Sequence, residues 1–106
     1  MALAVRRDTR MRVAEYRRWV EPRPDEERWE LLDGEPVLMA PPSARHQRIV
    51  TNLLTRLDRL AEPRGCGGYP GLAILSDAMD DYAPYPDVVV HCGSMPPSGY
   101  IDDPLP

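Results

Sequence analysis

The stretch RWELLDGEPVLMAPPSARHQRIVTNLLTRLDRLA, residues 28–61, decides the fold class, because it joins a strand pair to a long helix. Its first part contains Asp33-Gly34, a tight-turn signal, since glycine accepts the positive φ that a short hairpin turn requires. On the strand before this turn, Trp29 and Leu31 share one face, and Glu30 and Leu32 share the other. We therefore predict a β-hairpin over residues 28–40.

The second part of the stretch predicts the longest helix of the chain, over residues 44–61. Pro41-Pro42 ends the preceding strand, and Ser43 is a favoured helix-capping residue. Apolar side chains recur at helical spacing along this helix and are expected to face the core. They are Val50, Leu53, Leu54, Leu57, Leu60 and Ala61.

Another face of the same helix carries a polar stripe whose members are three or four residues apart: Arg45, Arg48, Asn52, Arg56 and Arg59. Two interpretations of this stripe stay open. It contacts a DNA backbone, or it is the solvated face of an amphipathic helix.

The rest of the chain predicts shorter elements. Residues 11–21 predict a helix with one apolar face. Residues 62–71 are rich in glycine and predict a loop, whereas LAILS, residues 72–76, predicts a strand. DVVVHC, residues 87–92, predicts a buried strand, and residues 93–106 predict a surface loop or a loose tail. Together the elements indicate a mixed α/β (α+β) fold.

The length of 106 residues suits one small domain, residues 1–106. All 13 basic residues are arginines, and all of them lie in residues 1–64. Residues 65–106 carry six acidic residues and no arginine. Such an acidic section suits a cation site better than a phosphate-binding surface, and a solvated acidic loop is the alternative.

Cys66 and Cys92 are the only cysteines, and they form neither a CxxC pair nor a set with zinc-ligand spacing. The chain starts without the apolar run of an export signal, so we expect reduced thiols and a cytoplasmic protein. No segment has the apolar length of a membrane span, and no membrane partner is expected.

Asp87 follows Pro86 and opens the apolar run of the last predicted strand. A carboxylate at the start of a buried strand is held rigidly, as a metal site demands. Mg²⁺ takes oxygen ligands of this kind, polarises a phosphate and lowers the pKa of an attacking water. The alternative is an aspartate that ends a turn with its side chain in water.

Glu30 and His46 are two further candidates. Glu30 lies on the hairpin face opposite Trp29, where a buried carboxylate needs a metal ion or an arginine. An exposed Glu30 would instead pair with a nearby arginine such as Arg28. His46 begins the apolar row of the long helix and is expected to point inward as a base, ligand or phosphate donor. A core-edge histidine bonded to the backbone is the alternative.

Taken in order, these segments resemble a known family. The matching pieces are Glu15-Tyr16 with Trp19, the ELLDGE hairpin of residues 30–35, PPSxxHQxIVxNLL within residues 41–54, and PDVVV in residues 86–90. This order and spacing resemble the Uma-two family of putative restriction endonucleases, a branch of the PD-(D/E)xK nuclease superfamily.

The resemblance implies a restriction-endonuclease-like core, a mixed sheet flanked by helices. It also implies metal-dependent hydrolysis of DNA, with Mg²⁺ as cofactor and DNA as partner. Asp87 matches the family's Pro-Asp metal carboxylate. Glu30 matches an acidic residue that approaches the same metal, and His46 matches the histidine that opens the long helix. All three are therefore candidate catalytic residues.

Three departures from the family pattern qualify this expectation. Arg12 replaces a capping Ser or Thr, and Tyr85 stands where the family often has arginine. In the family a further strand supplies the second carboxylate, and this sequence ends before it. We therefore expect an incomplete domain that does not cleave DNA by itself. A homodimer or a partner chain is then expected to cover the open sheet edge. A non-catalytic module that binds DNA or a partner is the alternative.

Overall fold

The computed structural model describes residues 10–96 and 99–102. Its elements in chain order are α2 (Val13–Val20), β1 (Trp29–Leu32), β2 (Glu35–Leu38), α3 (Ala44–Ala61), η1 (Glu62–Arg64), β3 (Cys66–Pro70), η2 (Asp77–Met79) and β4 (Val88–Cys92). The two sheets are antiparallel pairs, β1 with β2 and β3 with β4. The predicted mixed α/β (α+β) class is confirmed.

The predicted hairpin is confirmed and turns at Asp33-Gly34. Both residues have positive φ, 50° for Asp33 and 79° for Gly34. Leu32 pairs with Glu35 across the turn. Two consecutive positive φ values are those of the turn that matches the twist of paired strands.

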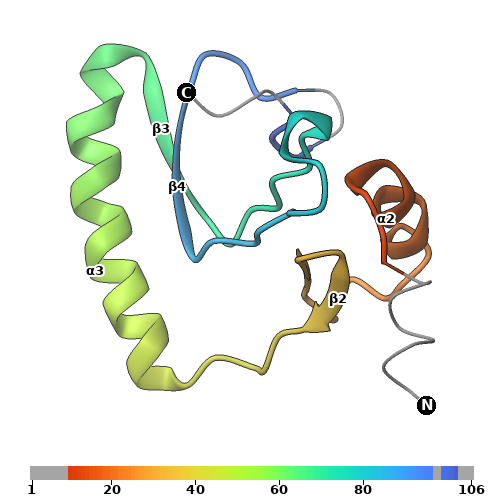
Figure 1. The fold of residues 1–106 in the computed structure, drawn as a ribbon. Coiled ribbons are helices and arrows are strands. Elements are labelled where there is room, and N and C mark those ends of the chain that lie inside the picture. Colours follow the sequence, from red (N-terminus) through yellow and green to blue (C-terminus); the bar gives the residue numbers. More distant parts are fainter. Residues whose placement is uncertain (1–9, 97–98, 103–106) are drawn as a thin grey trace.

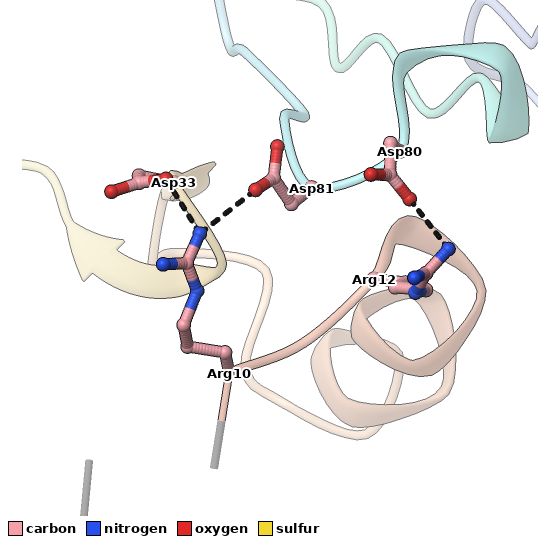
Figure 2. Close-up of polar contacts among 5 residues, drawn as sticks. All are labelled: Arg10, Arg12, Asp33, Asp80 and Asp81. Atoms are coloured by element: carbon pink, nitrogen blue, oxygen red, sulfur yellow. Dashed lines mark hydrogen bonds and ion pairs between the residues drawn. The ribbon is translucent and has the colours of Figure 1, made fainter. Parts of the chain in front are cut away.

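Two arginines ahead of α2 connect the helix to distant turns (Figure 2). The Nη2 atom of Arg10 lies 2.6 Å from Asp33 Oδ1 and 3.0 Å from Asp81 Oδ2. Arg12 Nη1 lies 3.0 Å from Asp80 Oδ1. These side chains are largely solvated, so the pairs orient the segments more than they stabilise them.

The core lies where α2, β1 and the segment around residues 75–83 meet. Its buried side chains are Val13, Tyr16, Leu31, Leu75 and Ala83. Leu31 is fully buried and exchanges two backbone hydrogen bonds of 2.9 Å with Ala83. The β1–β2 hairpin is therefore tied by its backbone to the segment that leads toward Asp87.

The helix α3 lies along the β3–β4 hairpin, on the side of the molecule away from α2 (Figure 1). The close approach depends on Gly68, because a Cβ atom there would lie 3.0 Å from Leu54 Cδ1. The Gly68 N–H also donates to Asp58 Oδ1 at 3.0 Å. The loop predicted over residues 62–71 is thus wrong for Cys66–Pro70, where the glycines form strand β3 under the helix.

The strand predicted over residues 72–76 is also wrong. Ile74 and Leu75 are buried, but only one bridge forms there, from Ile74 to Ile101. The Leu75 N–H donates to Ile101 C=O at 2.8 Å, and the Ile101 N–H donates to Ala73 C=O at 3.1 Å. The apolar side chains of this segment correctly indicated burial. The single bridge between Ile74 and Ile101 is enough to bury them without a regular strand.

The segment of residues 93–106 has no helix or strand in its described part, residues 93–96 and 99–102. Ile101 nevertheless is only 4% exposed and packs inside the molecule. Residues 97–98 and 103–106 lie outside the described residues.

The apolar face of α3 is less buried than predicted. Its ends Ser43 and Ala61 are as expected, and the Ser43 side chain accepts a hydrogen bond from the His46 N–H. However, Leu53 is 47% exposed and Leu60 is 72% exposed. A hairpin of two strands is narrower than the apolar stripe of the helix, so the margin of that stripe lies in solvent. For the same reason Val90 of β4, predicted to be buried, is 45% exposed.

The expectation of reduced thiols is wrong, because Cys66 and Cys92 form a disulfide. The two residues are direct partners in the antiparallel register of β3 and β4, with Cα atoms 3.9 Å apart. The sequence does not indicate this pairing, because 26 residues separate the two cysteines and the glycines around Cys66 predict a loop instead of a strand. The disulfide also removes the thiol argument for a cytoplasmic location.

Candidate functional site

Asp87 lies directly before β4, at the end of the β3–β4 hairpin opposite the disulfide. Its backbone C=O accepts a hydrogen bond of 2.9 Å from the Gly71 N–H, which closes this end of the hairpin. Gly71 has φ +43°, a conformation that L side chains rarely adopt. The Asp87 side chain is 52% exposed, so the carboxylate is accessible from solvent.

His46 lies in the first turn of α3 and faces Asp87. Its Nε2 atom is 3.2 Å from Asp87 Oδ2, and its side chain is 42% exposed. The capping bond from Ser43 to the His46 N–H is 3.1 Å and fixes this first turn. The structure therefore brings together two predicted site residues that come from separate elements.

Glu30 lies on β1 and contacts the segment that precedes Asp87. Its Oε2 atom accepts a hydrogen bond of 3.1 Å from the Tyr85 N–H. Burial raises the pKa of the Tyr16 phenol to about 12, and the negative charge of Glu30 adds to this effect. Among the described residues, the Glu30 carboxylate is hydrogen-bonded to a backbone N–H and forms no ion pair with Arg28.

Two pockets flank Asp87. One has a volume of about 470 Å³ and lies between residues 39–43, His46 and Asp87. The other has a volume of about 350 Å³ and lies between the start of β4 and the face of α3 that carries Gln47 and Thr51. Arg28 lines both pockets together with Asp87. Asp87 thus lines both of these accessible pockets.

The predicted DNA-backbone arginines lie on α3. Arg45, Arg48 and Arg56 are exposed, and no ion pair joins them to another described residue. A role in binding a phosphate backbone stays a prediction for all three.

The side chains near Asp87 can be compared with the ligands that the expected Mg²⁺ ion requires. Among residues 10–96 and 99–102, no group of three or more His, Cys, Asp or Glu side chains is arranged to hold a metal ion. The Asp87 carboxylate is a ligand of the type that Mg²⁺ takes, and Mg²⁺ often binds one or two carboxylates plus phosphate oxygens. Glu30 lines neither pocket of Asp87, so its part in metal binding stays a prediction.

The sequence reading missed two residues of this region. The sequence indicates Arg28 only as a possible partner of Glu30, and Tyr16 only as one of the residues that match the family. Neither position has a sequence signal for a site, because both are placed by tertiary packing against the segment of residues 83–87.

The family model Uma2, described as "Putative restriction endonuclease", matches residues 13–106. The chain belongs to this family. The Uma2 match begins at the first residue of α2 and includes Glu30, His46 and Asp87. Neither a curated protein nor a solved structure gives a significant match. No helix in the described part of this Uma2 chain is long and apolar enough to cross a membrane.

Proposed function

We propose that this chain contributes to metal-dependent hydrolysis of phosphodiester bonds in DNA. The observation that carries the proposal is the contact of 3.2 Å between His46 and Asp87 beside an open pocket, in a chain of a restriction endonuclease family. Asp87 would supply an oxygen ligand to Mg²⁺. The bound ion would polarise a phosphate and make an attacking water more acidic.

His46 has a positioning role in this proposal. The contact of 3.2 Å between His46 Nε2 and Asp87 Oδ2 would limit the rotation of the carboxylate, as an outer-shell partner of a metal ligand does. Glu30 acts through the backbone, because its bond to the Tyr85 N–H holds the segment that carries Asp87.

The described residues supply half of a metal site in this proposal. One carboxylate binds Mg²⁺ weakly, and a second ligand has to come from outside the described residues or from the phosphate itself. The expected result is weak metal binding and no cleavage of DNA by these residues alone.

The test is the binding of Mn²⁺ as a probe for Mg²⁺, measured by electron paramagnetic resonance. Asp87→Asn is expected to abolish the binding, whereas Asp25→Asn in an exposed turn leaves it unchanged. Equal binding by the wild type and Asp87→Asn would contradict the proposed ligand. Plasmid nicking by the wild type that Asp87→Asn abolishes would support the nuclease and contradict the half site.

A second candidate function is a non-catalytic module that binds DNA or a partner chain. The exposed apolar side chains of α3 favour it, since Ile49 is 59% exposed and Leu60 is 72% exposed next to the arginine stripe. Such a module would bind DNA equally well with Asp87→Asn and without metal. Fluorescence anisotropy of a labelled duplex distinguishes the two functions when the wild type and Asp87→Asn are compared in Mg²⁺ and in chelator, because only the metal-dependent function predicts that Mg²⁺ strengthens binding through Asp87.

A further inference from the structure

Arg28 is a half-buried arginine that no described carboxylate neutralises. The ion pairs among the described residues involve Arg10, Arg12, Arg17 and His46, but not Arg28. The guanidinium of an arginine keeps its positive charge under all ordinary conditions. A charge in such a position, without a partner, suits an anionic ligand.

The packing around Arg28 holds it in place. Its guanidinium carbon lies 5.6 Å from the centroid of the Tyr85 ring, a cation–π contact. Its Nη1 atom would lie 3.5 Å from a Cβ atom at Gly71, so the guanidinium packs against that turn. Its backbone C=O accepts a hydrogen bond of 2.7 Å from the Met39 N–H. The side chain is thus fixed beside the turn that bonds to the Asp87 C=O.

Arg28 and Asp87 line the same two pockets without forming an ion pair. A guanidinium and a carboxylate that line one pocket without pairing suit a ligand that carries both a positive and a negative charge. A metal-bound phosphate is such a ligand, because the cation meets the carboxylate and the anionic oxygens meet the guanidinium. The planar guanidinium also matches the geometry of two phosphate oxygens.

We propose that Arg28 binds a phosphate of the nucleic-acid backbone in the pocket beside Asp87 and His46. Arg28 is then the residue that contacts the phosphate in the pocket, whereas Arg45, Arg48 and Arg56 of α3 are exposed and line neither pocket of Asp87. The inference rests on the proposed function for the nature of the substrate. The role of Arg28 is tested by DNA binding and not by cleavage, so this inference and the proposed nuclease function can fail separately.

The experiment measures the binding of a short fluorophore-labelled DNA duplex by anisotropy, in chelator and at several salt concentrations. Arg28→Gln is expected to weaken binding about tenfold, as expected for the loss of a hydrogen bond to a charged group. The slope of log affinity against log salt should fall by about 1. Arg28→Lys should keep the slope of the wild type and bind with intermediate affinity.

The matched control is Arg18→Gln, which removes the same charge from an exposed position on α2. Circular dichroism checks that each variant is folded. If Arg28→Gln does not fold, the affinity of Arg28→Lys is compared with that of the wild type instead. Equal binding by Arg28→Gln and Arg18→Gln overturns the proposal, and so does a wild type that binds no duplex. A wild type that binds the duplex through Arg28 but binds no Mn²⁺ through Asp87 supports the role of Arg28 and contradicts the proposed metal-dependent function.

Discussion

The Nε2 atom of His46 lies 3.2 Å from Oδ2 of Asp87, although the two residues come from the start of α3 and the start of β4. The contact exists because α3 packs along the β3–β4 hairpin and ends its first turn beside Asp87. It places the imidazole against the carboxylate next to a pocket of about 470 Å³. The predictions below start from this arrangement and from the packing that maintains it.

Replacing His46 by Ala is expected to weaken Mn²⁺ binding roughly tenfold, within the range of roughly 10- to 100-fold seen for outer-shell partners of metal ligands. The reason is that Asp87 loses the imidazole that orients its carboxylate. Asn52→Ala, on an exposed position of the same helix, is the control and should bind Mn²⁺ as the wild type does. An unchanged affinity in His46→Ala would show that the histidine does not position Asp87.

Tyr16 is expected to make folding sensitive to alkaline pH. Burial raises the pKa of Tyr16 from 10.0 to about 12, and Glu30 adds to this effect. Because the folded-state pKa lies above the unfolded one, the stabilisation is fully present below pH 10 and is lost as pH rises toward about 12. The loss amounts to roughly 2–3 kcal/mol of unfolding free energy, at 1.36 kcal/mol for each pKa unit.

Urea unfolding at several alkaline pH values measures this loss. Tyr16→Phe removes the ionising group and should flatten the dependence on pH. Glu30→Gln should lower the pKa of Tyr16, which the ultraviolet absorbance of tyrosinate reports. A pKa that stays the same in Glu30→Gln would contradict the electrostatic effect of Glu30 on Tyr16.

Reduction of the Cys66–Cys92 disulfide is expected to lower the unfolding free energy by about 3 kcal/mol. The estimate follows from the chain entropy that a crosslink removes from the unfolded state when it closes a loop of this length. Urea unfolding with and without a reductant measures the difference. The double variant Cys66→Ser with Cys92→Ser should match the reduced wild type and show no response to reductant.

Replacing Gly68 by Val is expected to destabilise the protein by about 1–3 kcal/mol, the usual cost of overpacking. The added side chain meets Leu54 Cδ1, which lies 3.0 Å from the position of a Cβ atom. Gly67→Val is the control, because its Cβ atom would meet the Tyr69 ring at an ordinary 3.5 Å. Equal unfolding free energies for the two variants would show that α3 can move away from β3 at no cost.

The local sequence determined the elements that short-range chemistry can specify. Asp33-Gly34 placed the hairpin turn, because positive φ is a property of the residues themselves. Ser43 and the apolar repeat placed α3 with its observed bounds, Ala44–Ala61. The Pro-Asp pair and the valines placed Asp87 immediately before β4.

Only the tertiary structure decided the features that depend on contacts between distant segments. Gly67 and Gly68 indicated a loop, yet they form β3, because the absence of side chains lets α3 approach the strand. Cys66 and Cys92 form a disulfide because the register of β3 and β4 makes them opposite neighbours. Arg28 reaches the pocket of Asp87 through packing on Tyr85 and Gly71. In each case the deciding force is steric fit or pairing across space, which local sequence does not encode.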